Sequence, residues 1–547
     1  MTSRGRATHE VTNQPPPLQG YNLFEENRPL AEALRREGAA WAEPHLSALG
    51  KVAGTPEVLG WGTQANDHPP VLRTHDRFGN RIDEVDFHPA WHSLMRLAVE
   101  HGIHAMPWRE PRPGAHAARA AAMILMSGVE AGHGCPISMT YAAVPALRAQ
   151  PDLAAEWEPR LTSPTYDPRL IPAQDKAGAL AGMAMTEKQG GSDVRANTTR
   201  AAPLGDGAYE LTGHKWFCSA PMCDAFLVLA QAPSGLSCFF LPRVLPDGTR
   251  NAFHIQRLKD KLGNRSNASS EVEFDGAWAR LVGEEGRGIH TIIEMVNYTR
   301  LDCLLGSTGL MRAAVAQATH HATYRQAFGN VLADQPLMRN VLADLCVESE
   351  AATLMAMRTA RAVDDGQDDR AEADFRRLGV AVGKYWVCKS AVGVVGEALE
   401  CLGGNGYVEE SGMPRLYRET PLNSIWEGSG NVNALDVLRA IAKRPDALDA
   451  YLGEVELASD PRLDAFVAAL KDELANGDDI ETRARRVVEG LALALQGSLM
   501  IRYAPQQVAD AFCASRLAGH SGRTYGTLPP GLDFQAIIER HRPSVAA

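Results

Sequence analysis

The sequence has no surplus of positive charge. Its 55 lysines and arginines stand against 66 aspartates and glutamates, which gives a formal net charge of -11. A uniformly basic nucleic-acid-binding protein is therefore excluded, and any contact with DNA has to come from a local basic patch.

Paired cysteines, metal motifs and long apolar runs are also missing. The nine cysteines are scattered from Cys135 to Cys513 without a C-x-x-C pair, and there is no H-E-x-x-H pattern. We expect reduced thiols and no metal site. No uninterrupted apolar run is long enough to cross a membrane, and the first ten residues contain no apolar signal segment. We therefore expect a cytoplasmic protein with no membrane partner.

The pattern of apolar and polar residues divides the chain into segments. A length of 547 residues exceeds a single core, so several domains are expected. The pattern predicts a polar N-terminal arm (1–24), a helical domain (25–178), a β domain of short apolar stretches between turns (179–287), a helical bundle (288–444) and a helical C-terminal extension (445–547). Helices before and after a sheet domain indicate an α+β protein.

Two motifs lie in the first part of the predicted β domain. Residues 184–193 read A-M-T-E-K-Q-G-G-S-D, a glycine-rich turn whose backbone N–H groups and hydroxyls suit an anion or a ring edge. The same residues also fit a plain surface turn. Residues 213–219 read G-H-K-W-F-C-S, and their tryptophan fits a buried strand equally well.

Three further motifs lie in the predicted bundle. They are Y-R-Q-A-F-G (324–329) followed by Gln335, E-C-L-G-G-N-G-Y (400–407), and P-R-L-Y-R-E-T-P-L-N-S-I-W-E-G-S-G-N (414–431). An arginine presents a planar fork suited to a pyrophosphate, although a lone helical arginine is more often solvated. By contrast G-V-A-V-G-K-Y (379–385) is one residue short of a P-loop and lies in a helical context, so we interpret it as helix packing.

In this order the five motifs resemble those of the acyl-CoA dehydrogenase superfamily. The family patterns are A-M-T-E-P-x-x-G-S-D, G-x-K-x-W-I-T/S, R-x-x-F-G with a later Gln, Q-x-x-G-G-x-G-Y, and I-Y-E-G-T. The chain departs from them at Glu400, where many members have Gln, and at Trp426, where Tyr is usual. The segments L-P-D-G-T-R-N-A and R-L-K-D-K-L-G-N-R-S-N-A-S, with the C-terminal extension, are similar to the branch associated with the adaptive response to alkylation. The implied fold has an N-terminal helical domain, a middle β domain and a C-terminal four-helix bundle, here with the extra extension.

The resemblance implies FAD as cofactor and a homotetramer. Trp216 would pack against the isoalloxazine, Ser219 would bond to it, and Arg325 and Gln335 would reach the FAD of a neighbouring subunit. The full set of implied FAD-binding residues is Met185, Thr186, Gly191, Ser192, Trp216, Phe217, Ser219, Arg325, Phe328, Gln335, Gly403, Gly404, Ile425, Trp426, Gly428, Ser429 and Asn431.

Glu427 falls at the position of the catalytic base in many members of the family. By resemblance it would remove the α-proton of an acyl-CoA thioester while the β-hydride goes to the flavin. Burial would raise the pKa of this carboxyl and make its ionised form a stronger base. The Glu427 N–H and a ribityl hydroxyl of FAD would bind the thioester oxygen.

The resemblance also implies binding of double-stranded DNA, largely through the extension. Residues 445–547 hold 10 Lys+Arg and 15 Asp+Glu, a difference of -5. A local patch built from Arg483, Arg485, Arg486, Arg502, Arg516 and Arg523 would still suffice for phosphate contacts. Three hypotheses stay open: a DNA-protecting flavoprotein with weak isovaleryl-CoA-like dehydrogenase activity, a metabolic short- or branched-chain acyl-CoA dehydrogenase, and a structural DNA-protecting protein in which FAD only stabilises the fold.

Overall fold

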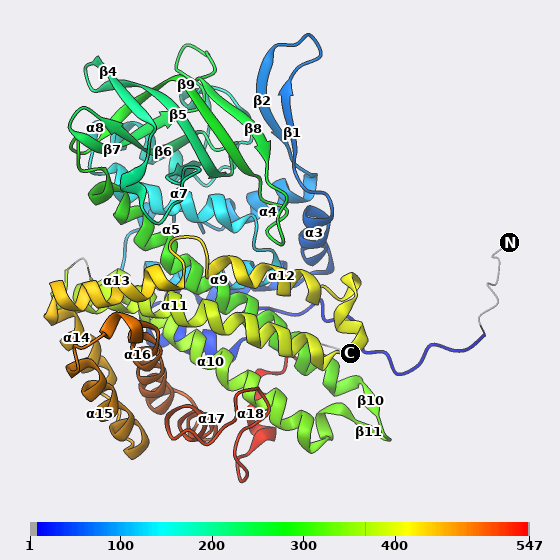
Figure 1. Ribbon diagram of the computed structural model, residues 1–547. Helices are drawn as coiled ribbons and strands as arrows, with labels where there is room; N and C mark the ends of the chain where they lie inside the picture. The colour runs from blue at the N-terminus through cyan, green and yellow to red at the C-terminus, as the bar shows by residue number, and fades with distance from the viewer. Residues whose placement is uncertain (1–7, 367, 545–547) are drawn as a thin grey trace.

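The computed structural model describes residues 8–366 and 368–544. It shows a sheet domain resting on a large helical body, with helices from both ends of the chain in that body (Figure 1). The predicted fold class, α+β with the acyl-CoA dehydrogenase arrangement, is confirmed. Residues 1–7 of the predicted arm lie outside the described residues.

The N-terminal part is mostly helical, as expected, with one exception. Its helices are α1 (Arg28–Arg36), α2 (Glu43–Ala53), α3 (Pro56–Asp67), α4 (Pro89–Glu100), α5 (Met106–Arg109), α6 (Ala115–Val129), α7 (Gly134–Leu147) and α8 (Pro151–Leu161). The exception is an antiparallel hairpin of β1 (Val71–His75) and β2 (Arg81–Asp86). Its turn is built by Asp76, whose side chain accepts hydrogen bonds from the backbone N–H groups of Phe78 and Asn80.

The sheet domain has seven strands. They are β3 (Ala181–Ala184), β4 (Arg200–Gly205), β5 (Ala208–Ser219), β6 (Ala225–Ala232), β7 (Gly235–Pro242), β8 (Phe253–Leu258) and β9 (Ser269–Val282). The order is β3-β6-β4-β5-β9-β7, with β8 paired to β9 and β7 also paired to β6. Five of the strands therefore close a ring, and β3 lies outside it as a parallel neighbour of β6.

Three long helices form the centre of the helical body: α9 (Gly288–Tyr324), α10 (Pro336–Asp365) and α11 (Arg370–Cys401). A short hairpin of β10 (Gln326–Ala327) and β11 (Asn330–Val331) joins the first two, and α12 (Met413–Asn423) and α13 (Gly430–Lys443) follow the third. The alanine-rich α6 is buried on nearly all sides and packs closely against α9. A Cβ at Gly309 would meet the carbonyl oxygen of Ile124 at 2.3 Å, so this crossing requires glycine.

The length and composition of α11 alone would allow it to cross a membrane, although we expected no such segment. In the structure 72% of its most apolar window is buried inside the protein. Such burial is typical of a core helix, which explains its unbroken apolar character.

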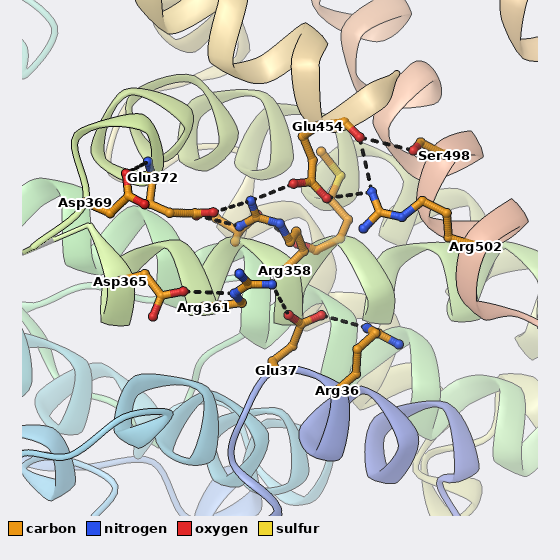
Figure 2. Close-up of polar contacts among 12 residues, drawn as sticks. Arg36, Glu37, Arg358, Arg361, Asp365, Asp369, Glu372, Glu454, Ser498 and Arg502 are labelled. Carbon is orange, nitrogen blue, oxygen red and sulfur yellow. Dashed lines mark hydrogen bonds and ion pairs between the residues drawn. The ribbon is translucent and has the colours of Figure 1, made fainter. Parts of the chain in front are cut away.

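The C-terminal extension packs on the central helices rather than standing apart. It comprises α14 (Pro445–Val455), α15 (Pro461–Ala475), α16 (Ile480–Tyr503), α17 (Gln506–Phe512), a π-helical turn (Cys513–Leu517) and α18 (Phe534–His541). Figure 2 shows one of its anchors. Glu454 of α14 accepts from Arg358 of α10 at 2.8 Å and from Arg502 of α16 at 2.7 Å.

Candidate functional site

A cavity of about 570 Å³ lies between the sheet domain and the helical body. Its wall combines residues from α6, α7, α9 and α12 with residues from β3 and β5. Much of it is apolar, through side chains such as Met123, Met139, Ile292, Val296 and Leu422. A concave apolar site with a few polar groups is the usual form of a small-molecule site.

Ten of the predicted FAD-binding residues and the predicted base meet at this cavity. They are Met185, Thr186, Gly191, Ser192, Phe217, Ser219, Ile425, Trp426, Gly428 and Ser429, together with Glu427. These residues come from three motifs that are far apart in the sequence, and only the packing of β3 and β5 against the α12–α13 region brings them together.

Trp216 is placed outside the cavity, which corrects the prediction that it packs against the flavin. The pairing of β5 with β9 is irregular between Lys215 and Cys218, so strand alternation alone does not say which of Trp216 and Phe217 faces the cavity. Phe217 does so, with 51% of its surface exposed. The Trp216 ring is covered instead by Lys259, whose Nζ lies 3.4 Å from the ring centre.

The remaining predicted FAD-binding residues do not line the cavity of this chain. Arg325, Phe328 and Gln335 lie at the β10–β11 hairpin, where Arg325 donates to the backbone oxygen of Asn13 at 2.6 Å and Phe328 is 96% exposed. Gly403 and Gly404 lie in a 3-10 turn (Gly403–Tyr407) after α11. Asn431 is the second residue of α13, and its side chain accepts a hydrogen bond from Arg485 at 2.9 Å.

The cavity fits a flavin, the group that the motifs imply. The Thr186 and Ser192 hydroxyls face it and make no hydrogen bond with any side chain or backbone group in the described part of the chain. A Cβ at Gly191 would meet the Thr186 hydroxyl at 2.4 Å, so glycine is needed to keep that hydroxyl where it is. Free hydroxyls beside the exposed ring of Phe217 suit the polar edge and the flat face of an isoalloxazine.

Glu427 lies in the loop between α12 and α13 (424–429), which we call the Glu427 loop. Its backbone has φ of +57°, a left-handed conformation that costs a non-glycine residue on the order of 1–3 kcal/mol. Thr299 of α9 donates from Oγ1 to Glu427 Oε2 at 2.9 Å, and Arg300 Nε donates to the Glu427 carbonyl oxygen at 2.9 Å. Thr299 therefore holds the carboxylate at the cavity wall, and Arg300 holds the backbone of the same residue.

Burial raises the pKa of the Glu427 carboxyl above its usual range. The Thr299 hydrogen bond and the positive charges of Arg300 and Lys384 oppose this effect but do not cancel it. The group is thus placed as a desolvated carboxylate base.

Several polar residues at the cavity were not predicted from the sequence. Burial lowers the pKa of Lys261 to about 8, and burial raises the pKa of Glu419 to about 7 and that of Cys135 to about 11. Thr299, Arg300 and Cys135 lie outside every motif that we recognised. Lys261 lies inside the D-K-L-G-N run and Glu419 inside the motif at 414–431, but neither residue was assigned a role there.

The predicted DNA-binding arginines do not form one free patch. Four are engaged in ion pairs: Arg483 and Arg486 with Glu473, Arg502 with Glu454, and Arg516 with Asp344 and Glu348. Arg485 is exposed and contacts Asn431. Of the six, Arg523 is exposed and makes no ion pair with any residue in 8–366 or 368–544. The carboxylates that outnumber these arginines thus neutralise most of them directly.

Comparisons with known proteins cover nearly the whole chain. Residues 13–168 match the adaptive response protein AidB N-terminal domain, 182–277 the acyl-CoA dehydrogenase middle domain, and 286–442 the acyl-CoA dehydrogenase C-terminal domain. The chain is 48% identical to AidB of Escherichia coli (strain K12) over 520 residues, covering 94% of this chain and 95% of that protein.

Two comparisons point to a nematode relative. The chain is 32% identical to acyl-CoA dehydrogenase family member 11 of Caenorhabditis elegans over 487 residues, covering 82% of this chain and 78% of that protein. The crystal structure of Caenorhabditis elegans ACDH-11 in complex with C11-CoA superposes with a TM-score of 0.86 at 29% identity, covering 94% of this chain and 95% of that one.

Proposed function

The chain belongs to the acyl-CoA dehydrogenase family as an AidB-like member, and we propose that it oxidises acyl-CoA thioesters with FAD as its cofactor. The single observation that carries this proposal is Glu427, a buried carboxylate at the wall of a largely apolar cavity that the flavin-motif residues share. FAD, when bound, supplies the hydride acceptor.

The chain's own residues would supply the proton chemistry. Glu427 would take the α-proton of the thioester, and the apolar wall would exclude the water that otherwise stabilises its charge. The Glu427 N–H would bind the thioester oxygen as enolate charge develops. Thr299 would hold the carboxylate in one orientation through its 2.9 Å hydrogen bond.

The cavity gives room for an acyl group of modest size. Met123, Met139, Ile292 and Val296 offer this acyl group an apolar surface. The relative ACDH-11 was crystallised with C11-CoA, which supports an aliphatic acyl chain here. Isovaleryl-CoA, a short branched thioester, is the second ligand to compare.

Anaerobic titration of the yellow protein tests this function. We expect isovaleryl-CoA or a C11 acyl-CoA to bleach the flavin band, and Glu427→Gln to keep its flavin while losing the bleaching. An unaltered bleaching rate in Glu427→Gln would remove Glu427 from the reaction.

As a second function we propose that the protein acts in the cytoplasm as a homotetramer that binds and protects double-stranded DNA. Its support is the similarity to AidB, which covers 94% of this chain and therefore reaches into the C-terminal extension. The extension offers no large basic surface built from the predicted DNA-binding arginines, because ion pairs neutralise four of them: Arg483, Arg486, Arg502 and Arg516. The surface that would serve contains the exposed Arg485 and Arg523.

A gel shift at two salt concentrations, alongside sedimentation analysis of the oligomer, tests this second function. We expect a salt-sensitive shift that weakens in an Arg485→Ala, Arg523→Ala double variant. Bleaching by acyl-CoA without any shift would leave the metabolic dehydrogenase as the whole function.

A further inference from the structure

Three consecutive carbonyl oxygens of the Glu427 loop are each held by a cationic side chain. Lys384 donates from Nζ to the Trp426 oxygen at 2.9 Å and also to the Gly428 oxygen. Arg300 donates from Nε to the Glu427 oxygen at 2.9 Å, and its Nη1 lies 2.9 Å from Asp436. Lys384 therefore brackets Glu427, whose backbone is left-handed, from the residues on both sides.

Lys384 differs from the other buried lysines among the described residues. Lys215 pairs with Glu187 at 2.9 Å and Lys176 pairs with Asp224 at 2.6 Å. Lys384 is 1% exposed and, within residues 8–366 and 368–544, forms no ion pair and donates only to carbonyl oxygens. An ammonium buried without a carboxylate is costly, so helix packing alone does not explain its presence.

The contact with Trp426 also decides where the next N–H points. A trans peptide is planar, and its C=O and N–H point in opposite directions. Because Lys384 holds the Trp426 oxygen, the Glu427 N–H points away from Lys384, and it has no hydrogen-bond acceptor in the described part of the chain. A cation on the carbonyl end polarises the peptide and strengthens the donor at its other end.

We propose that Lys384 is a positioning residue that orients and polarises the Trp426–Glu427 peptide, so that its N–H donates a hydrogen bond to the carbonyl oxygen of the thioester substrate. This inference rests on the proposed function, because it requires a thioester at Glu427. If it holds, Lys384 is the reason that the protein binds a thioester more tightly than a ligand without the carbonyl group.

The first test measures binding rather than turnover. In Glu427→Gln, which does not consume the ligand, the affinity for an acyl-CoA thioester is compared with that for an S-alkyl-CoA thioether of equal chain length, by perturbation of the flavin spectrum. We expect the thioester to bind on the order of tenfold more tightly. Adding Lys384→Met should abolish this preference, whereas adding Lys389→Met, five residues later on α11, should preserve it.

The second test is the pH dependence of flavin bleaching in otherwise wild-type protein. Lys384 lowers the pKa of Glu427, so Lys384→Met should move the acid limb of the rate to higher pH, and Lys389→Met should not. The other groups that face Glu427 are Thr299, Arg300 and Cys303 from α9 and Cys135 from α7, and none of them is changed.

The outcomes separate this inference from the proposed function. An unchanged thioester preference and an unmoved acid limb in Lys384→Met overturn the role of Lys384 while leaving Glu427 as the base. If Lys384→Met does not retain flavin, Lys384→Gln replaces it, since its amide still donates but carries no charge; it should move the acid limb too. Absence of bleaching in the wild type would instead overturn both proposals.

Discussion

Thr299 donates a hydrogen bond to Glu427 across 2.9 Å, linking the N-terminal third of α9 to a carboxylate 128 residues later in the chain. This contact favours the ionised carboxylate and lowers the pKa of Glu427, while burial raises it by a larger amount. The balance of the two sets the pH at which the base is available.

Replacing Thr299 with Val should weaken the reaction at low pH. The hydroxyl lowers the pKa of Glu427, so its loss raises that pKa further, and a larger fraction of the base is protonated as the pH falls. The acid limb of kcat/KM should therefore move to higher pH. The value on the high-pH plateau should fall less than the value at low pH. Thr299→Ser, which keeps the hydroxyl, is the matched control; a common profile for both variants would contradict this role.

Phe217 and Trp216 should differ in their effect on flavin binding. Phe217 faces the cavity and Trp216 lies under Lys259 outside it. Removing an aromatic contact costs about 1 kcal/mol, so Phe217→Ala should raise the Kd for FAD by roughly fivefold to tenfold. Trp216→Ala should leave it unchanged. Fluorescence titration of the apoprotein checks this, and the reverse ranking would restore Trp216 as the flavin contact.

The anchor of the C-terminal extension should depend on Arg358. This guanidinium binds Glu372 at 2.9 Å and Glu454 at 2.8 Å, and all three groups are largely buried (Figure 2). Arg358→Met leaves two buried carboxylates without this partner, which should lower the free energy of unfolding by about 3 kcal/mol. Arg361→Met breaks a half-exposed pair with Asp365 and a longer 3.7 Å contact with Glu37, which keeps its 2.8 Å pair with Arg36, so it should cost under about 1 kcal/mol. Denaturant titration of both variants gives the comparison, and equal losses would refute it.

The same anchor should make stability depend on pH. Burial opposes ionisation of Glu454, but hydrogen bonds from Arg358 and Arg502 lower its pKa overall. A carboxyl with a lowered folded pKa contributes stability above its unfolded pKa of about 4.3, and this contribution is lost as pH falls through the folded value. The stability difference between wild type and Glu454→Gln should therefore be largest near neutral pH and shrink in acid. A difference that grows on acidification would show the opposite sign of coupling.

Much of the fold was readable from local pattern. The change from helical periodicity to short apolar stretches near residue 179, and back near residue 288, marked the sheet domain. The first and last strands of that domain are β3 and β9. The hairpin at residues 71–86 was missed, because Asp76 and Gly79 make a turn whose strands are too short and too exposed to show alternation.

The sequence by itself determined the family, the cofactor motifs and the candidate base, because each is carried by consecutive residues whose chemistry does not depend on distant parts of the chain. Only the tertiary structure decided that Phe217 rather than Trp216 faces the cavity, since the pairing of β5 is irregular between Lys215 and Cys218 and local alternation cannot say which side chain points inward. It also decided that Arg502 and Arg516 bind carboxylates of the same chain and that Lys384 holds Trp426. Those contacts join helices far apart in sequence, and the partner of a charged side chain is set by the packing that brings it near.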